Sequence, residues 1–363
     1  MALGPNSLQQ FALPSYWDAA TLEKFRLASG ETYDQLVGDI GSALAIANQD
    51  VLSDPLNASL MSITTDAAFE YAIGVSNGFT AHTEYGRPDA RRGATTGHML
   101  PLNSYDRLLA WTWDFLRKAR RVQIDADVAS AIQDYKDLWQ KQLLTRLFKE
   151  TYTAVGSSGR SMPIADGGTA DATYVPLPFP DRGGTFLYTH DHVRPLDGIT
   201  QANLETAVGL LWEHGYDAPF DLVVAQADIS SWVNTSNVTG FVARGSALVN
   251  QGVTADVANV SAAYVGVVLT TYGECRVRAT GRIPTTYWAV YKSFGSGDQR
   301  NPLVVRVGTD YGSSATLLRG DHIREFPLEE AIIFAEFGVG VGNRVGAVAC
   351  KNTSSTYSDP TIT

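Results

Sequence analysis

The sequence predicts an α+β fold in which one long helix is the central element, an extended β-hairpin precedes it and a series of strands follows it. Three observations support this prediction. Apolar residues recur every three or four positions through residues 125–154, which is the spacing of one helix face. Residues 59–103 show the partial alternation of strands but few large apolar side chains. From residue 266 onward, short strand-like runs alternate with turn residues.

The predicted central helix carries one apolar stripe, and most of its charged residues lie on other faces. Asp125 or Asp127 is expected to cap its start, because a carboxylate accepts hydrogen bonds from the free N–H groups of the first turn. The glycine- and serine-rich run that begins at Gly156 is expected to end it. Such a helix is roughly 40 Å long and is expected to span a whole domain. Its apolar stripe consists of Val128, Ile132, Tyr135, Trp139, Leu143 and Leu147.

Composition limits the function classes. The chain has 363 residues and a formal net charge of -10, which argues against sequence-independent binding of nucleic acid, because such binding needs lysine and arginine to replace condensed counterions. Two cysteines, Cys275 and Cys350, lie in apolar runs and are expected to be buried free thiols, with a disulfide as the alternative. Residues 1–11 have no signal-peptide pattern, and no apolar run reaches the roughly 20 residues of a membrane helix.

The chain before the central helix predicts an arm, a helix and a hairpin. Trp17 and Phe25 lie in an irregular N-terminal stretch that is expected to pack either on its own core or on a neighbouring subunit. Residues 31–50 have helical spacing and end before Asp54-Pro55. Residues 58–103 predict an extended hairpin with a basic tip, which is either a solvated loop or an arm that reaches an adjacent subunit. The tip arginines are Arg87, Arg91 and Arg92.

The chain after the central helix predicts a second α/β region and then a return to strands. Residues 200–214 have the spacing of a short helix that ends at Gly215, and residues 220–225 read as a buried strand. The tail from Thr353 is polar and expected to fray. Further strands are expected at 267–269, 275–279, 287–291 and 303–307, and a last strand pair at 332–335 and 345–350.

One group of side chains resembles a metal site. His190, Asp191 and His192 place two imidazoles beside a carboxylate, and a third ligand would have to come from His214 or Glu213. The alternative is a polar loop or interface, and a lone His-x-His pattern favours it. The glycine-rich run at 338–342 lacks the Lys-Ser/Thr ending of a phosphate loop, so it is expected to be a tightly packed bend. No paired carboxylates or nucleophile motif suggest an enzyme.

The order of elements resembles the major capsid proteins of tailed double-stranded DNA bacteriophages, which have the Hong Kong 97-type fold. The stretches 281–288 and 301–303 have the texture typical of the return to the peripheral domain in that family. By this resemblance, residues 1–57 correspond to an N-terminal arm, 58–103 to an E-loop hairpin, 104–155 and 269–351 to a peripheral domain with the spine helix 125–154, 156–268 to an axial domain and 352–363 to a C-terminal tail.

The resemblance implies a shell protein that assembles with itself into pentamers and hexamers and encloses a double-stranded DNA genome without binding it sequence-specifically. It implies location in the virion, assembly in the host cytoplasm, and scaffolding, portal and decoration proteins as further partners. No catalytic residue, metal, cofactor or membrane contact is expected. The alternatives are an encapsulin-like compartment with the same fold and a metalloenzyme that uses His190, Asp191 and His192. The candidate intersubunit contacts are Arg87, Arg91, Arg92, Asp134, Asp137, Glu150, Trp17 and Phe25.

Overall fold

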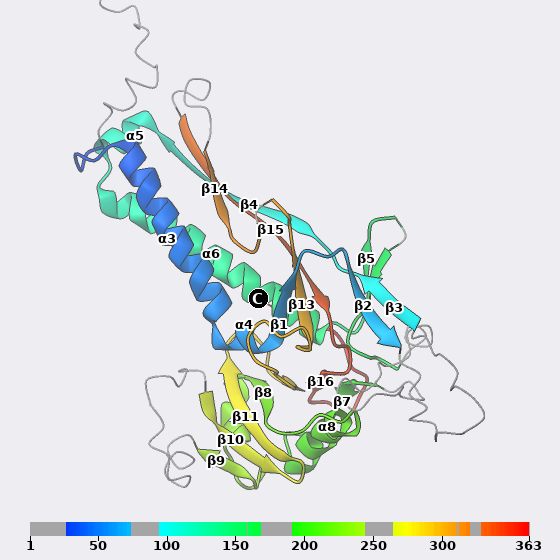
Figure 1. The fold of residues 1–363 in the computed structure, drawn as a ribbon. Coiled ribbons are helices and arrows are strands. Elements are labelled where there is room, and N and C mark those ends of the chain that lie inside the picture. Colours follow the sequence, from blue (N-terminus) through cyan, green and yellow to red (C-terminus); the bar gives the residue numbers. More distant parts are fainter. Residues whose placement is uncertain are drawn as a thin grey trace, which may run out of the picture. The chain divides into compact units, whose positions relative to one another are not determined.

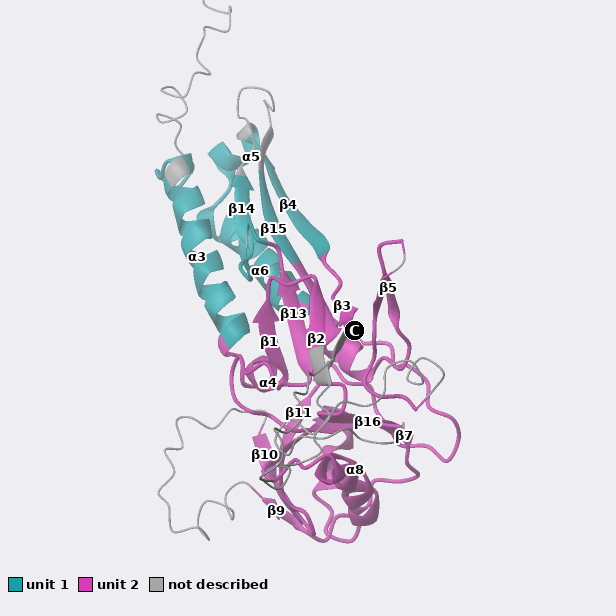
Figure 2. Cartoon of the chain, turned by 45° about the vertical axis from the view of Figure 1, so that its right-hand side comes forward, with its two compact units in different colours: residues 1–52, 103–138, 309–336 teal, residues 53–102, 139–308, 337–363 magenta. Residues whose placement is uncertain are grey.

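The fold is seen in a computed structural model, drawn in Figure 1. The structure describes residues 27–73, 94–157, 159–167, 191–243, 264–310, 312–319 and 328–362. The chain divides into two compact units (Figure 2). Unit 1 consists of residues 1–52, 103–138 and 309–336, and unit 2 consists of residues 53–102, 139–308 and 337–363.

Helix α3 (Tyr33–Ser53) opens the described part of unit 1 and confirms the helix predicted at 31–50. Its first turn is closed by a reciprocal pair, because the Gln35 N–H donates to Thr32 Oγ1 and the Thr32 N–H donates to Gln35 Oε1. The helix ends before Asp54, whose carboxylate caps the following short helix α4 (Pro55–Leu60). The buried apolar face of α3 includes Leu36, Ile40, Leu44 and Ala47.

The central helix is α6 (Arg121–Phe148), so it begins at residue 121 and not at 125, and it ends at 148 and not at 154. The capping prediction is wrong, because Asp125 and Asp127 both lie inside α6, beyond its first turn. Asp125 pairs with Arg121, and Asp127 accepts a hydrogen bond from the Trp111 indole. All six apolar positions predicted for the stripe fall within α6. No helix in the described residues is long and apolar enough to cross a bilayer.

Strand β15 (Leu328–Val341) organises a five-stranded sheet. It pairs with β13 (Leu303–Val307) and β14 (Thr316–Arg319) in antiparallel fashion, and β4 (Asn103–Thr112) also pairs with it. Strand β1 (Met61–Thr64) lies parallel to β13. Helix α5 (Trp113–Lys118) follows β4 directly.

Unit 2 contains a seven-stranded sheet whose order is β7-β16-β12-β8-β11-β10-β9. Predicted strands 220–225 and 287–291 are confirmed with the same bounds as β8 and β12. Its other members are β7 (Val193–Pro195), β9 (Phe241–Ala243), β10 (Tyr264–Thr270), β11 (Gly273–Thr280) and β16 (Ala347–Lys351).

Helix α8 (Gln201–Glu213) confirms the helix predicted at 200–214 and packs on this sheet. Thr200 caps its start by accepting from the Asn203 N–H, and Gly215 ends it at a φ of 86°. Leu204, Val208 and Leu211 of α8 join the core, in which Trp232 of the short helix α9 (Ile229–Trp232) meets Trp288 edge-on. Cys275 and Cys350 are both free and buried, as predicted.

Two hairpins complete unit 2. The ladder of β2 (Ala68–Ile73) with β3 (Ala94–Met99) supplies the described part of the predicted hairpin, and it closes at the pair Ile73 and Ala94. The intervening residues 74–93 lie outside the described residues. The second hairpin consists of β5 (Thr153–Val155) and β6 (Gly159–Ser161). It begins within residues that were predicted to end the central helix, so α6 ends before it.

The glycine-rich run Gly338–Gly342 is a packed crossing, and the predicted strand pair around it is wrong. Strand β15 includes Gly338 and Gly340, ends at Val341 and pairs with β13, whereas β16 pairs with β12 and β7. A Cβ on Gly338 would lie 2.2 Å from the carbonyl oxygen of Pro101, and a Cβ on Gly340 would lie 2.4 Å from Leu100 Cδ2. The glycines therefore allow the Leu100–Leu102 segment to cross β15 at backbone distance.

The C-terminal tail packs on unit 2, so the prediction that it frays is wrong. Tyr357 and Ile362 are 6% and 4% exposed. The Tyr357 hydroxyl donates to the Phe148 carbonyl over 2.7 Å, and the Tyr287 hydroxyl donates to the Ser358 carbonyl over 2.8 Å. The Glu150 N–H donates to Asp359. The tail thus satisfies free backbone groups at the end of α6, which the polar composition of residues 352–363 did not indicate.

The two compact units do not follow the domain ranges expected from the sequence. The expected boundary between 268 and 269 falls inside β10, and β11, β12 and β16 join the same sheet as β8. The residue pattern along the chain suggested that these strands belong to different domains, but hydrogen bonds join them in one sheet. A strand that is buried on both faces has no residue pattern that identifies its neighbours. The assignment of 104–155 with 269–351 to a peripheral domain and of 156–268 to an axial domain stays a prediction.

Candidate functional site

Two of the predicted contact residues lie on α6 in unit 1. Asp134 is 3.6 Å from Arg107 of β4, and both side chains are more than half exposed. Asp137 accepts a hydrogen bond of 2.7 Å from Gln133. An exposed ion pair of this kind contributes about 0–1 kcal/mol. Asp134 can therefore exchange Arg107 for another cation at small cost.

The third predicted acid, Glu150, lies beyond the end of α6 and belongs to unit 2. The prediction that it shares the helix with Asp134 and Asp137 is therefore wrong. Burial raises the pKa of Glu150 above its ordinary value, and the nearby Asp359 and Asp166 raise this pKa further. Glu150 thus belongs to an acidic group under the C-terminal tail and not to a row of helix carboxylates.

Several predicted residues lie outside the described part of the chain, so their contacts stay predictions. They are the arm aromatics Trp17 and Phe25, the tip arginines Arg87, Arg91 and Arg92, and the first histidine of the metal candidate, His190.

The structure brings one residue of the metal candidate, His192, together with its proposed third ligand, His214, as a buried hydrogen-bonded pair. His192 and His214 are 0% and 1% exposed, and their Nε2 atoms are 3.1 Å apart. His192 Nδ1 lies 3.0 Å from the Ala347 carbonyl oxygen. Because a carbonyl only accepts, we assign the proton to this Nδ1, so that His192 Nε2 accepts from His214. The pair links the C-terminal end of α8 to β16.

Asp191 turns toward its own backbone, because its Oδ1 accepts the Val193 N–H over 2.6 Å. Burial raises the pKa of Asp191 to about 6, the Val193 hydrogen bond and Arg194 oppose this rise, and Glu150 and Asp166 add to it. Among the described residues, no three histidine, cysteine, aspartate or glutamate side chains are grouped to hold a metal ion. His192, His214 and Asp191 are thus used in internal hydrogen bonds.

His98 at the end of β3 is another buried imidazole. It is 4% exposed and lies beside the Phe69 ring, with ring centroids 6.4 Å apart. Burial lowers the pKa of His98 to about 4, and the positive charges of Arg344 and Arg146 lower it further against the opposing hydrogen bond to the Met99 carbonyl. His98 is therefore neutral in the folded protein at neutral pH and mildly acidic pH.

Acid is expected to destabilise unit 2 through His98. Its pKa is 6.5 when unfolded and about 4 when folded, so the unfolded state binds the proton first as the pH falls. The free energy of unfolding therefore begins to fall as the pH drops below 6.5, and the total loss approaches about 3 kcal/mol near pH 4 and below.

Urea unfolding of the wild type and of His98→Gln between pH 4 and 7 checks this. The variant should lose most of this slope, and an unchanged slope would contradict the prediction. Asp191→Asn is the control, because the raised pKa of Asp191 acts in the opposite direction.

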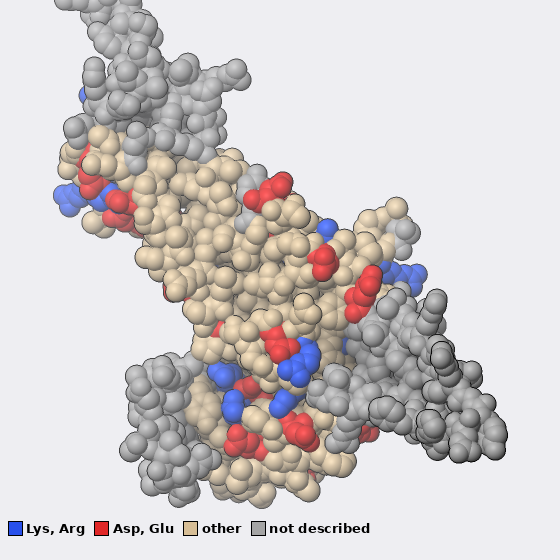
Figure 3. Space-filling view, in the orientation of Figure 1, with Lys and Arg blue, Asp and Glu red and all other residues tan. Residues whose placement is uncertain are grey.

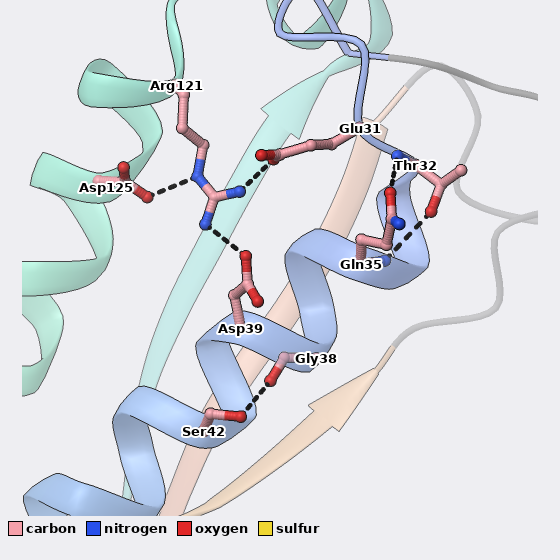
Figure 4. Close-up of polar contacts among 8 residues, drawn as sticks. All are labelled: Glu31, Thr32, Gln35, Gly38, Asp39, Ser42, Arg121 and Asp125. Carbon is pink, nitrogen blue, oxygen red and sulfur yellow. Dashed lines mark hydrogen bonds and ion pairs between the residues drawn. The ribbon is translucent and has the colours of Figure 1, made fainter.

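A cluster around Arg121 joins α3 to the start of α6 within unit 1 (Figure 4). Its Nη2 lies 2.9 Å from Asp39, its Nε lies 2.7 Å from Asp125, and its Nη1 pairs with Glu31. These carboxylates, Asp125 first, raise the pKa of Arg121 above its ordinary value. Three carboxylates surround one guanidinium, so these four side chains together carry an excess of negative charge.

On the face drawn in Figure 3, the acidic and basic side chains of the described residues are interspersed and do not form a continuous positively charged surface. Basic side chains of unit 2 are partly neutralised by neighbours. Arg278 lies 3.3 Å from the buried Asp221, and Arg300 lies 3.0 Å from Asp298.

The long helix, the hairpin ladder, the sheet organised by β15 and the α/β sheet of unit 2 together define the Hong Kong 97-type capsid fold. Solved structures show the same fold. A chain from Mycobacterium phage Patience is 21% identical with a TM-score of 0.60, and the match covers 94% of each chain. A chain of the capsid of Ralstonia phage GP4 is 10% identical with a TM-score of 0.50, covering 83% of this chain and 91% of that one. No protein-family model and no curated protein sequence matches this chain.

Proposed function

We propose that this chain is the major capsid protein of a tailed double-stranded DNA phage and assembles with itself into the icosahedral shell around the genome. The observation that carries the proposal is the likeness to the Mycobacterium phage Patience chain, which extends over 94% of both chains. The likeness to a chain of the capsid of Ralstonia phage GP4, over 83% of this chain and 91% of that one, supports the same proposal. The role is structural and uses no catalytic residue.

The partners of the proposal are further copies of the chain, arranged as pentamers and hexamers, with scaffolding, portal and decoration proteins as additional partners. Assembly takes place in the host cytoplasm, and the product is the virion. The formal net charge of -10 supports an inner wall that encloses DNA without binding its sequence. Shells of this kind need modest contacts that are repeated many times.

The contacts between copies are proposed to involve both chain extensions. Trp17 and Phe25 of the arm supply apolar anchors on a neighbour. Arg87, Arg91 and Arg92 supply positive charge for acidic partners, for which the sequence suggests Asp134, Asp137 and Glu150. Of these three, Asp134 and Asp137 are the better candidates, because Glu150 lies under the C-terminal tail while Asp134 is 55% exposed.

Reversing the charge of the three tip arginines is expected to block assembly. The variant Arg87→Glu/Arg91→Glu/Arg92→Glu replaces attraction to acidic partners by repulsion, so the assembled fraction should fall at least tenfold while the circular dichroism spectrum of the monomer is unchanged. The matched control is the triple lysine variant, which keeps the charge and should assemble. Normal shells from the glutamate variant would contradict the proposed role of these arginines.

The proposal as a whole is tested by negative-stain electron microscopy and size-exclusion chromatography of the chain, alone and with a co-expressed scaffolding protein. Closed shells, tubes, or rings of five and six subunits are expected. Particles that enclose a protein cargo would favour the encapsulin-like compartment. A monomer or dimer that never assembles under either condition, and that binds metal through His190 and His192, would favour the metalloenzyme and overturn the proposal.

A further inference from the structure

Unit 2 contains a hollow of about 520 Å³ beside β1, the edge strand of the five-stranded sheet. Residues of β1, of β13 and of the first half of β2 line it, and all three strands belong to this unit (Figure 2). Asp66 and Glu70 are its charged lining residues among those that the structure describes, and no described lysine or arginine lines it. The hollow therefore carries negative charge that no lining cation balances.

The floor of this hollow contains a buried polar side chain that has no partner. Ser62 of β1 is 2% exposed, and its register partner on β13, Val304, is 1% exposed. Ser62 lines the hollow, and its hydroxyl forms no hydrogen bond with any described residue. Buried hydroxyl groups are normally hydrogen-bonded, because an unsatisfied one costs free energy. A ligand in the hollow that carries an N–H donor would satisfy this oxygen.

One side of the hollow is apolar. A Cβ on Gly342 would lie 2.4 Å from Val304 Cγ2 and 3.4 Å from Phe69 Cε2, so the Phe69 ring and the Val304 side chain lie close together. Ala68 continues this apolar side. Methylene groups of a ligand would lose contact with water there, and an ammonium group within about 6 Å of the ring face would be attracted to it.

The two carboxylates of the hollow lie at separate places on the chain. Thr64 Oγ1 donates to Asp66 Oδ2 over 3.0 Å and accepts from the Asp66 N–H over 3.1 Å, which holds Asp66 at the end of β1. Glu70 lies opposite Gly97 of β3, which has no side chain to pair with it. Both acids are exposed, and neither forms an ion pair with a described residue. Four residues span at most about 14 Å, so the two charges suit a ligand whose cationic groups are spaced along a chain.

We propose that this hollow binds a linear aliphatic polyamine. Its ammonium groups pair with Asp66 and Glu70, one of them donates to Ser62, and its methylene chain lies along Phe69 and Val304. A lone metal ion fits less well, because a particle of the size of a water molecule fills only about 30 Å³. In addition, no three histidine, cysteine, aspartate or glutamate side chains of the described residues are grouped to hold a metal ion. The inference concerns the folded chain and does not depend on the shell function.

Isothermal titration calorimetry of the intact chain with spermidine tests the site, at about 0.15 M salt so that unspecific attraction is screened. The wild type should bind saturably, and Asp66→Asn/Glu70→Gln should bind roughly tenfold or more weakly with an unchanged circular dichroism spectrum. The matched control is Asp197→Asn/Asp217→Asn, which removes the same charge from exposed positions of unit 2 that do not line the hollow, and it should bind like the wild type. No saturable binding by the wild type, or equal affinities of the two variants, would overturn the proposal.

Three further titrations identify the ligand class. Ser62→Ala should weaken spermidine binding by roughly threefold to tenfold without lowering the urea midpoint of the free chain, because its hydroxyl has no partner to lose. Magnesium ions at the same concentration should not displace spermidine, and displacement would mean that the hollow attracts any cation and would overturn the proposal. The peptide Gly-Lys-Gly should bind roughly tenfold or more weakly than spermidine, because it offers one side-chain ammonium to two carboxylates. Equal binding would indicate a site for a lysine of a partner protein and would also overturn it.

Discussion

Replacing Gly338 by alanine is expected to lower the free energy of unfolding of unit 2 by about 3 kcal/mol. The added Cβ would lie 2.2 Å from the Pro101 carbonyl oxygen and 2.5 Å from its carbonyl carbon. Both are backbone atoms, so no side-chain rotation relieves the clash, and either β15 or the Leu100–Leu102 segment must move. Urea denaturation followed by circular dichroism measures the loss.

Gly38→Ala is the matched control, because it makes the same chemical change where there is room. Gly38 lies in α3, is exposed, and has no atom within 4 Å of the place that an added methyl group would occupy. Alanine there should raise stability by about 0.5–1 kcal/mol, since it favours the helix. Equal stabilities of the two variants would show that the crossing at Gly338 is not tight.

Replacing Tyr357 by alanine is expected to cost about 3–5 kcal/mol, the range for removing a large buried aromatic side chain. Tyr357 is 6% exposed, meets the Tyr287 ring edge-on at 6.0 Å and donates to the Phe148 carbonyl. Tyr357→Phe keeps the ring and removes only the hydrogen bond, so it should cost about 1 kcal/mol. Thermal unfolding and urea unfolding measure both variants.

Thr356→Ala is the control within the same tail, because Thr356 is exposed and its change should stay within about 0.5 kcal/mol. A second readout is amide hydrogen exchange at the end of α6, which should accelerate in Tyr357→Ala and not in Thr356→Ala. A Tyr357→Ala protein as stable as the wild type would mean that the contacts of the tail do not stabilise unit 2.

Local patterns predicted most elements of the fold, because periodicity and composition act within a few residues. Strands β8, β12 and β13 have the predicted bounds, since each is a short apolar run between turn residues. These local patterns do not predict the order of the strands in a sheet. Nothing in residues 347–351 indicates a place between β7 and β12, and nothing in residues 338–342 indicates a crossing by the distant Leu100–Leu102 segment.

The candidate site was predictable only in part, for the same reason. The acidic and basic contact residues stand out by charge. The sequence also singled out His192 and His214 as polar groups but did not indicate that they are buried against each other, because the two imidazoles come from different elements and meet only in the folded core.

The position of β16 also determines when the protein can fold during its synthesis. The strand lies inside the seven-stranded sheet, between β7 and β12, yet it follows every other strand of that sheet in the chain. A ribosome adds residues one at a time from the N-terminus, so this sheet lacks an interior strand until all its other strands have been synthesised. Chains truncated before β16 therefore cannot complete unit 2. Such chains are not competent to enter a growing particle, and the fold itself excludes them.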